Sequence, residues 1–334
     1  MLNLDWRAIA DARVLELLER VRDRAPAYFP GIDATARIDV QARWQRVYSD
    51  VYRLRIVGDT RTSRDVILKI FAEAEIQYRA MVMAWPRFAQ HPTLKMPRPL
   101  DYFPEGPAIV MEAVEGQSLQ RRLPRVHWLE RRTSSAERDC RFAGQWLKFY
   151  HGLGPLGEGH LAVGAKLEGF QEAVGKLADT GVGRQQGAMW ADQLRVDGEE
   201  LRSRLLPVSR VHGDFTIDNV LLDGPRAIGL DVWAIDTNVI YHDVASFLNS
   251  LLLLRLTRPL SWSFLSRLRS AFLHGYSGVE SRDELAVTFL QRVGLVDVAL
   301  EIRARRPSAF SRVLLNYLMV PAMRTLAASA RRDS

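Results

Sequence analysis

The hydrophobic pattern changes its period partway along the chain, and this change constrains the fold most. From about residue 36 to residue 71 the pattern is strand-like, with RVYSDVYRLRIVG and DVILKIF on either side of a polar turn. Residues 72–89 return to helical spacing, and residues 96–114 give a loop and two strands around a Pro-Glu-Gly turn. The chain up to Glu115 therefore predicts a small twisted sheet with one inserted helix.

Beyond Gly116 the pattern is mainly helical. Residues 134–151 begin with a good N-cap and carry one apolar face. The apolar run at 244–254 is too short to span a bilayer and predicts a buried helix. Residues 255–330 predict further helices. The expected breaks between these helices are Arg258-Pro259, Gly275, Gly294 and Pro307.

Two further segments complete the expected organisation. Residues 4–24 have apolar positions at helical spacing and predict an N-terminal helix. Residues 211–236 interrupt the helical region with VLLD and AIGLDV, two short strands around a Gly-Pro turn. The expected fold class is α+β and bilobal: a small β-rich lobe at 1–113 and a larger, mainly helical lobe at 114–334.

The composition is that of a globular protein in a reducing compartment. Hydrophobic residues make up 47% of the chain and charged residues 25%. The single cysteine, Cys140, excludes an internal disulfide framework. The N-terminal residues lack the apolar core of a signal peptide, so a cytoplasmic location is expected. We interpret Cys140 and His151, on the helix at 134–151, as packing residues.

The net charge of +7 is concentrated at one end of the chain. Residues 251–334 contain 13 arginines against 6 acidic residues, which accounts for the whole excess. Such a region can contact an anionic partner, for example an anionic membrane surface, or it can simply be a set of solvated helix faces. No basic stripe with interleaved aromatic residues and no zinc-ligand spacing is present, so no nucleic-acid partner is expected.

Polar residues surround the short hairpin of 211–236. His212, Asp214 and Asn219 precede its first strand, and Asp231 follows its second. A magnesium–nucleotide site needs hard oxygen ligands, of which a carboxylate and a carboxamide supply two. A second carboxylate near an acceptor can take its proton. The spacing therefore indicates a site for phosphoryl transfer.

Lys69 lies in the middle of the expected strand VILKIF, where a charge is costly unless it meets an anion. The chain has only five lysines against 41 arginines, so composition alone favours arginine there. A compact ammonium can reach phosphates from a strand, and Glu73 or Glu75 on the following helix could pair with it. The alternative is a strand-edge lysine whose ammonium reaches water.

These segments together resemble the aminoglycoside phosphotransferase/choline kinase-like branch of the protein-kinase fold over residues 36–250. HGDFTIDN is similar to the catalytic loop of that family, and GLDV to the segment that bears its second metal-binding aspartate. YHDVASF resembles the family's following aspartate element. VILKIF resembles the small-lobe lysine strand, and AIVMEAVEGQSL the hinge strand that leads into the large lobe.

The resemblance implies a role for each polar residue of the catalytic-loop region. Asp214 is expected to orient the acceptor hydroxyl and to accept its proton. Asn219 and Asp231 are expected to hold Mg²⁺ on the phosphates. His212 and Asp243 are expected to support the loop by hydrogen bonds.

The resemblance also implies a nucleotide site in the small lobe. Lys69 is expected to contact the α- and β-phosphates of ATP and to pair with Glu75, with Glu73 as the alternative. Backbone groups from Glu112 to Val114 are expected to bind the adenine edge. Ser49, in the turn YSDV, is the expected donor that covers the phosphates.

The implied function is ATP- and Mg²⁺-dependent transfer of the γ-phosphate to a hydroxyl of a small molecule or glycan, such as a sugar, a lipid-linked saccharide or a related metabolite. Asp218 and Asp236 are candidates for the acceptor side, or solvated turn carboxylates. One alternative is an aminoglycoside or other antibiotic O-phosphotransferase, although the basic helical region disfavours a polycationic acceptor. Another is a nucleotide-binding pseudokinase that acts as a scaffold.

Overall fold

The computed structural model describes residues 11–33, 35–46, 48–58, 62–123, 133–178, 184–233, 235–257, 260–277 and 283–305. Within these residues the chain forms two compact units. Unit 1 comprises the chain up to Gly116 together with a segment that begins at Ile228 and ends before Ile235; unit 2 comprises the rest. The boundary expected after residue 113 stays a prediction. The N-terminal sheet and the helical C-terminal region confirm the α+β class.

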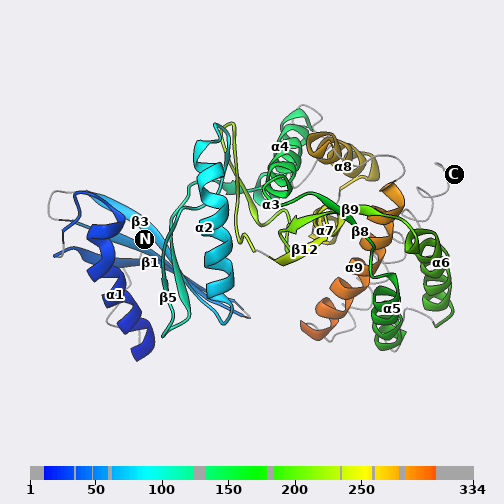
Figure 1. The fold of residues 1–334 in the computed structure, drawn as a ribbon, viewed down its shortest axis with the longest axis horizontal. Coiled ribbons are helices and arrows are strands. Elements are labelled where there is room, and N and C mark those ends of the chain that lie inside the picture. Colours follow the sequence, from blue (N-terminus) through cyan, green and yellow to red (C-terminus); the bar gives the residue numbers. More distant parts are fainter. Residues whose placement is uncertain are drawn as a thin grey trace. The chain divides into compact units, whose positions relative to one another are not determined.

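Unit 1 is built on a five-stranded antiparallel sheet in the order β1-β2-β3-β6-β5 (Figure 1). Its elements are α1 (Ala12–Tyr28), β1 (Arg37–Gln45), β2 (Asp50–Val57), β3 (Ser63–Ile70), α2 (Ala74–Gln90), β4 (Leu94–Lys95), β5 (Pro99–Phe103) and β6 (Ala108–Glu112). The expected strands and the inserted helix are therefore present.

Helix α1 differs from the helix expected at 4–24. The side chain of Asp11 accepts a hydrogen bond from the first turn and caps the helix there, and residues 4–10 lie outside the described part of the chain. The expected end is wrong, since the helix continues through Pro26 to Tyr28. The Tyr28 hydroxyl donates to Asp101 Oδ2 over 2.8 Å, so a contact with the sheet holds this last turn in place.

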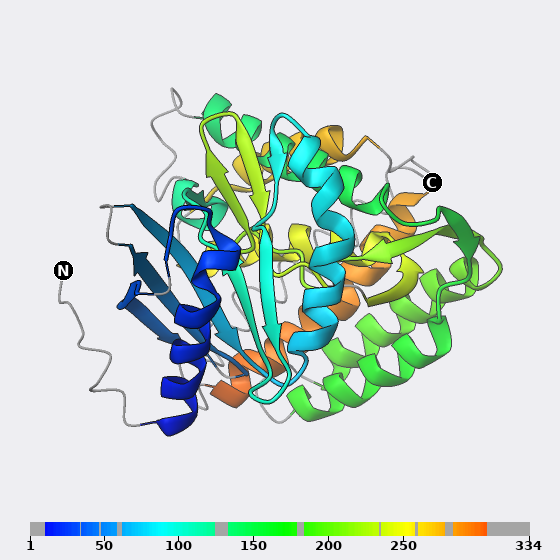
Figure 2. The same ribbon diagram turned by 60° about the vertical axis from the view of Figure 1, so that its left-hand side comes forward.

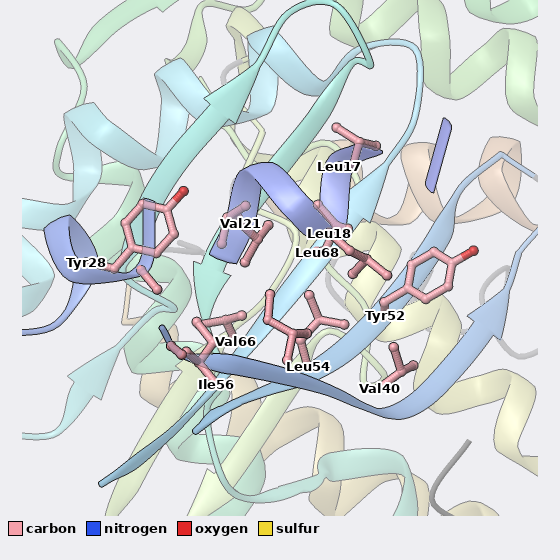
Figure 3. Close-up of a cluster of buried hydrophobic side chains, with 14 of the residues drawn as sticks. Leu17, Leu18, Val21, Tyr28, Val40, Tyr52, Leu54, Ile56, Val66 and Leu68 are labelled. Atoms are coloured by element: carbon pink, nitrogen blue, oxygen red, sulfur yellow. The ribbon is translucent and has the colours of Figure 1, made fainter. Parts of the chain in front are cut away.

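One face of the sheet and one face of α1 form the core of unit 1. Alternate residues of β2 and β3 point to this face, because side chains in a strand alternate between its two sides. The side chains drawn in Figure 3 include Leu17, Leu18, Val21, Tyr28, Val40, Tyr52, Leu54, Ile56, Val66 and Leu68, all buried. Burying each of the aliphatic side chains contributes about 1.5–3 kcal/mol. Since Leu68 faces α1, its neighbour Lys69 must point to the opposite face.

Helix α2 covers that opposite face and runs alongside β5 (Figure 2). Its buried side chains recur at helical spacing, which places them in one stripe toward the sheet. They are Ala74, Gln77, Ala80, Met81, Ala84 and Phe88. Five of the six are apolar, and Gln77 is the exception.

Unit 2 is mainly helical. Its elements are β7 (Gln117–Ser118), α3 (Leu119–Arg122), α4 (Thr133–His151), β8 (Gly157–Gly159), α5 (Val163–Ala178), α6 (Arg184–Arg202), β9 (Leu206–Val211), β10 (Val220–Asp223), β11 (Arg226–Gly229, whose last residues belong to unit 1), β12 (Ile235–Val239), α7 (Tyr241–Thr257), α8 (Trp262–Tyr276) and α9 (Glu284–Arg305). Strands β8, β9 and β12 form a small antiparallel sheet, and β10 pairs with β7. Among the described helices, none is long and apolar enough to cross a membrane.

Glycines allow helices of unit 2 to pack closely against each other. A Cβ at Gly144 of α4 would collide with the Phe272 carbonyl of α8, and a Cβ at Gly275 would collide with the Arg141 carbonyl. The break expected at Gly294 is wrong, because α9 runs through it. A Cβ there would come within 2.9 Å of an α7 side-chain amide, so this glycine permits close packing rather than ending a helix.

Candidate active site

The segment after β9 forms a loop whose backbone is bonded to α7. The N–H groups of His212 and Gly213 donate to Asp243 Oδ2 and Oδ1 over 2.6 Å and 2.8 Å. Asp243 lies in the first turn of α7 and is fully buried. Gly213 has a φ of +85°, a conformation that favours glycine. These are the contacts of a residue that supports the loop, the role expected for Asp243.

Asp243 has a third buried partner that the sequence interpretation missed. His151 Nε2 lies 2.8 Å from Asp243 Oδ2, and His151 Nδ1 lies 2.8 Å from the Tyr276 hydroxyl. Burial raises the pKa of Asp243, but the hydrogen bond from His151, the nearby imidazoles and the His212 N–H outweigh it and hold the pKa below its ordinary value. The interpretation of His151 as a packing residue is therefore wrong, whereas Cys140 is buried as expected.

The His212 ring is held by an aromatic cluster. Its centroid lies 5.9 Å from those of Trp146 and Tyr150 and 5.4 Å from that of Phe215. Its Nδ1 accepts a hydrogen bond from the Asp214 N–H over 3.4 Å. The ring is fully buried, so its contacts fit the supporting role expected for it rather than proton transfer.

Asp214 and Asn219 lie side by side at the two ends of the loop. Asn219 Nδ2 donates to Asp214 Oδ2 over 3.0 Å and to the Asp214 carbonyl over 2.8 Å. The Ile217 N–H donates to Ser250 Oγ of α7 over 3.1 Å, which fixes the middle of the loop. Because the amide nitrogen of Asn219 is engaged with Asp214, its carboxamide oxygen is the atom left for a metal ion.

In unit 1 the structure brings Lys69 and Asp231 together, although they lie 162 positions apart in the chain. Lys69 Nζ is 2.7 Å from Asp231 Oδ1, and the lysine side chain is buried. The ammonium also lies 4.7 Å from the centre of the Phe71 ring, which packs edge-on against Trp233. Asp231 has a φ of +51°, a strained conformation of the kind found at functional sites.

The expected pairing of Lys69 with Glu75 is wrong. Glu75 is exposed and pairs with Arg79 one turn along α2, and Glu73 precedes the helix with its side chain exposed. The helix partner of Lys69 is Gln77, whose Oε1 lies 3.1 Å from Nζ. The helical period could have shown this, since position 77 lies in the apolar stripe of α2 and position 75 does not.

The segment expected to bind the adenine edge, residues 112–114, lies at and just after the end of β6. The N–H groups of Glu112 and Ala113 donate to the carbonyls of Arg98 and Asp65 over 2.9 Å and 3.0 Å. The Val114 N–H has no partner among the described residues. Their roles toward adenine stay a prediction.

Ser49 lies partly buried in the β1–β2 turn, where its carbonyl accepts from the Arg46 N–H. On the expected acceptor side, Asp218 is exposed in the turn before Asn219, and Asp236 lies in β12 with its side chain outside the described part of the chain. The structure places these residues on their elements without testing the roles expected for them.

His242, next to Asp243, gives unit 2 a pH-dependent stability. Burial and the charge of Lys166 lower the pKa of His242 to about 4, against a smaller opposing effect of Asp243. Between about pH 6.5 and pH 4 the unfolded chain therefore binds a proton that the folded chain does not. We expect the free energy of unfolding to fall by about 2–3 kcal/mol as the pH drops through this window.

Urea unfolding at a series of pH values measures this dependence. His242→Gln should lose this part of the pH dependence, whereas His274→Gln, at an exposed position of α8, should keep it. Parallel pH profiles for wild type and His242→Gln would contradict the assignment.

Comparison with protein families agrees with this geometry. A family model described as "Phosphotransferase enzyme family" matches residues 39–286, which is most of the chain. The chain belongs to this family. As expected from its sequence, the phosphotransferase is thus an enzyme of the small-molecule kinase class that acts on hydroxyl acceptors. No curated protein matches it.

Several solved structures have the same fold as the phosphotransferase. A glucosamine kinase in complex with glucosamine, ADP and inorganic phosphate is 14% identical with a TM-score of 0.60, covering 90% of this chain and 98% of that one. A choline kinase from Cryptosporidium parvum is 11% identical with a TM-score of 0.59, covering 95% and 97%. An amicoumacin kinase in complex with AMP-PNP and Ca²⁺ is 14% identical with a TM-score of 0.58, covering 94% and 96%. At these identities the likeness shows the kinase-like fold.

Proposed function

We propose that this phosphotransferase transfers the γ-phosphate of ATP, with Mg²⁺, to a hydroxyl of a small molecule or glycan. The observation that carries the proposal is the buried Asp243, which fixes a loop that presents the Asp214 carboxylate beside the Asn219 carboxamide. A carboxylate held in this way can orient a hydroxyl and accept its proton as the oxygen attacks. Asp214 is exposed, so an acceptor can reach it.

Each unit offers one ligand of the kind that Mg²⁺ takes together with phosphate. Asn219 offers a carboxamide oxygen and Asp231 a carboxylate, both hard oxygen ligands. Among the described residues, no group of three or more His, Cys, Asp or Glu could hold a metal on its own. Mg²⁺ commonly takes one or two protein ligands and completes its shell with water and phosphate oxygens. When bound, the ion neutralises charge on the phosphates.

Lys69 and the hinge support the choice of nucleotide. The Lys69 ammonium lies at the end of a buried side chain and donates to Asp231. When a nucleotide binds, a phosphate oxygen can replace Asp231 as the acceptor of this hydrogen bond. The Val114 N–H is a donor for a ring nitrogen of adenine. The glucosamine kinase contains ADP and the amicoumacin kinase AMP-PNP, which agrees with an adenine nucleotide here.

The charge distribution along the sequence supports a neutral or anionic acceptor. Residues 251–334, in the helical region beyond the loop, contain 13 arginines against 6 acidic residues. A polycationic aminoglycoside would meet a like charge in such a region. We therefore propose a sugar, a lipid-linked saccharide or a related metabolite as the acceptor rather than a polycationic antibiotic.

The nucleotide half of the proposal is tested by binding. MgATP should raise the Tm of the wild type, because a ligand that binds only the folded state stabilises it. Lys69→Met should weaken MgATP binding about ten- to hundredfold, since a hydrogen bond from a charged donor to the phosphates is lost. Isothermal titration calorimetry measures the affinity, with Lys176→Met on the exposed face of α5 as the matched control. Equal affinities for wild type and Lys69→Met would contradict the proposal.

A further inference from the structure

Gln77 lies at the centre of the buried contacts around Lys69. Its side chain is fully buried on the face of α2 that covers the sheet. Oε1 of Gln77 accepts from Lys69 Nζ over 3.1 Å, and Nε2 donates to Asp231 Oδ1 over 3.3 Å. The direct contact of Lys69 Nζ with the same Oδ1, at 2.7 Å, closes a triangle. One neutral side chain thus contacts a cation and an anion together.

The chemistry of the neighbours determines which way this amide points. An ammonium can only donate and a carboxylate can only accept, so the oxygen of Gln77 must face Lys69 and its nitrogen must face Asp231. A glutamate here would keep the first bond but would place one carboxylate against another. A leucine would occupy a similar volume and make neither bond. The geometry therefore requires a neutral group that both donates and accepts.

The three side chains form a cluster with balanced charge, because Lys69 and Asp231 offset each other and Gln77 is neutral. A phosphate that draws Lys69 away leaves the Asp231 carboxylate facing a second anion. A cation that draws Asp231 away leaves the buried ammonium facing a second cation. Phosphate alone is therefore repelled by the unpaired Asp231 carboxylate, and a cation alone by the unpaired Lys69 ammonium. When both ligands bind, each of the two charged groups has an opposite charge beside it.

We propose that Gln77 is a positioning residue that couples binding of the metal ion to binding of the nucleotide, an inference that rests on the roles proposed above for Lys69 and Asp231. In the unliganded protein the amide bridges the ion pair. When phosphate and metal ion arrive together, Gln77 keeps one bond to each member of the pair as their direct contact gives way. The ligands then replace the lost ion pair on both sides at once.

The first test compares the affinity for a fluorescent ADP analogue with and without Mg²⁺. Gln77→Glu should weaken binding about tenfold without Mg²⁺ and leave it close to wild type with Mg²⁺, because the metal ion offsets the added charge. Gln77→Leu should weaken binding about tenfold with Mg²⁺ and only about twofold without it, because the amide that links the two charged groups, and the coupling with it, is lost. Gln90→Glu and Gln90→Leu, at the exposed end of α2, are matched controls that should behave like wild type.

The second test uses no nucleotide. Adding MgCl₂ to the wild type should hardly change its Tm, since Lys69 competes with the cation for Asp231. In Gln77→Glu the introduced carboxylate can pair with Lys69 and release Asp231. Mg²⁺ should therefore raise the Tm of this variant by about 2 °C more than that of the wild type or of Gln90→Glu.

The outcomes separate this inference from the proposed function. ADP binding by all variants, with the Gln77 and Gln90 variants alike in both tests, would overturn the coupling and leave the proposed function standing. Failure of the wild type to bind ADP in either condition would overturn the proposed function and the coupling with it. The expected pattern is a metal dependence of ADP binding that grows in Gln77→Glu and shrinks in Gln77→Leu.

Discussion

Asp214→Asn should lower the rate of phosphoryl transfer about a thousandfold, within the range usual for loss of a general base. The amide keeps the size of the side chain but cannot accept the proton of the attacking hydroxyl. The affinity for MgATP should stay close to that of the wild type, because the nucleotide is assigned to Lys69, Asp231 and the hinge. ADP formation with a hydroxyl-bearing acceptor measures the rate, and titration calorimetry measures the affinity.

The control for this substitution is Asp192→Asn, at an exposed position of α6. It makes the same chemical change away from the loop, and its rate should equal that of the wild type. A rate for Asp214→Asn within a few fold of the control would remove Asp214 from the proposed role of base. Loss of MgATP binding together with the rate would instead point to a structural or metal-binding role for this carboxylate.

Asp243→Ala should cost about 3–5 kcal/mol of folding free energy, a magnitude typical when one partner of a buried charged contact is removed. The substitution leaves the N–H groups of His212 and Gly213 and the ring of His151 without their acceptor. Buried donors without acceptors account for this cost. The loop should also lose its position, so transfer should fall even under conditions in which the variant is folded. Urea unfolding and the transfer rate measure the two effects.

Asp197→Ala is the matched control for Asp243→Ala. Asp197 is also a buried carboxylate, and it pairs with Arg292 of α9 rather than with the loop. Its loss should destabilise the protein to a similar degree while the folded fraction keeps its transfer rate. If both variants lose stability and rate in the same proportion, Asp243 stabilises the fold without positioning the loop.

The catalytic loop could be predicted from the sequence because its chemistry is local. Asp214 and Asn219 are five residues apart, and one turn of chain brings their side chains into contact. Lys69 could be predicted because a lysine in an apolar strand is unusual in a chain with so few lysines. Its orientation follows from strand alternation, which places it opposite the buried Leu68.

The partners of these residues could not be read in the same way. We expected a carboxylate as the partner of Lys69, and Gln77 has no charge that would mark it as that partner. Its position in the buried stripe of α2 could nevertheless be predicted from the helical period. His151 contacts Asp243 and Tyr276, which are 92 and 125 residues away along the chain. Sequence spacing does not predict contacts between residues so far apart in the chain. Glycine is common at helix ends, so the sequence predicted a break at Gly294. Only the packing of α9 on α7 explains why the helix continues through it.

Phosphorus-31 NMR of the wild-type protein with MgATP and a panel of sugars, glycosides and other hydroxyl-bearing metabolites tests the central claim most directly. With an acceptor of the right class, a phosphomonoester signal should grow in step with ADP, and Asp214→Asn should give neither. MgATP that binds but yields no phosphomonoester with any hydroxyl, or only inorganic phosphate, would contradict the account and favour a nucleotide-binding protein without transferase activity.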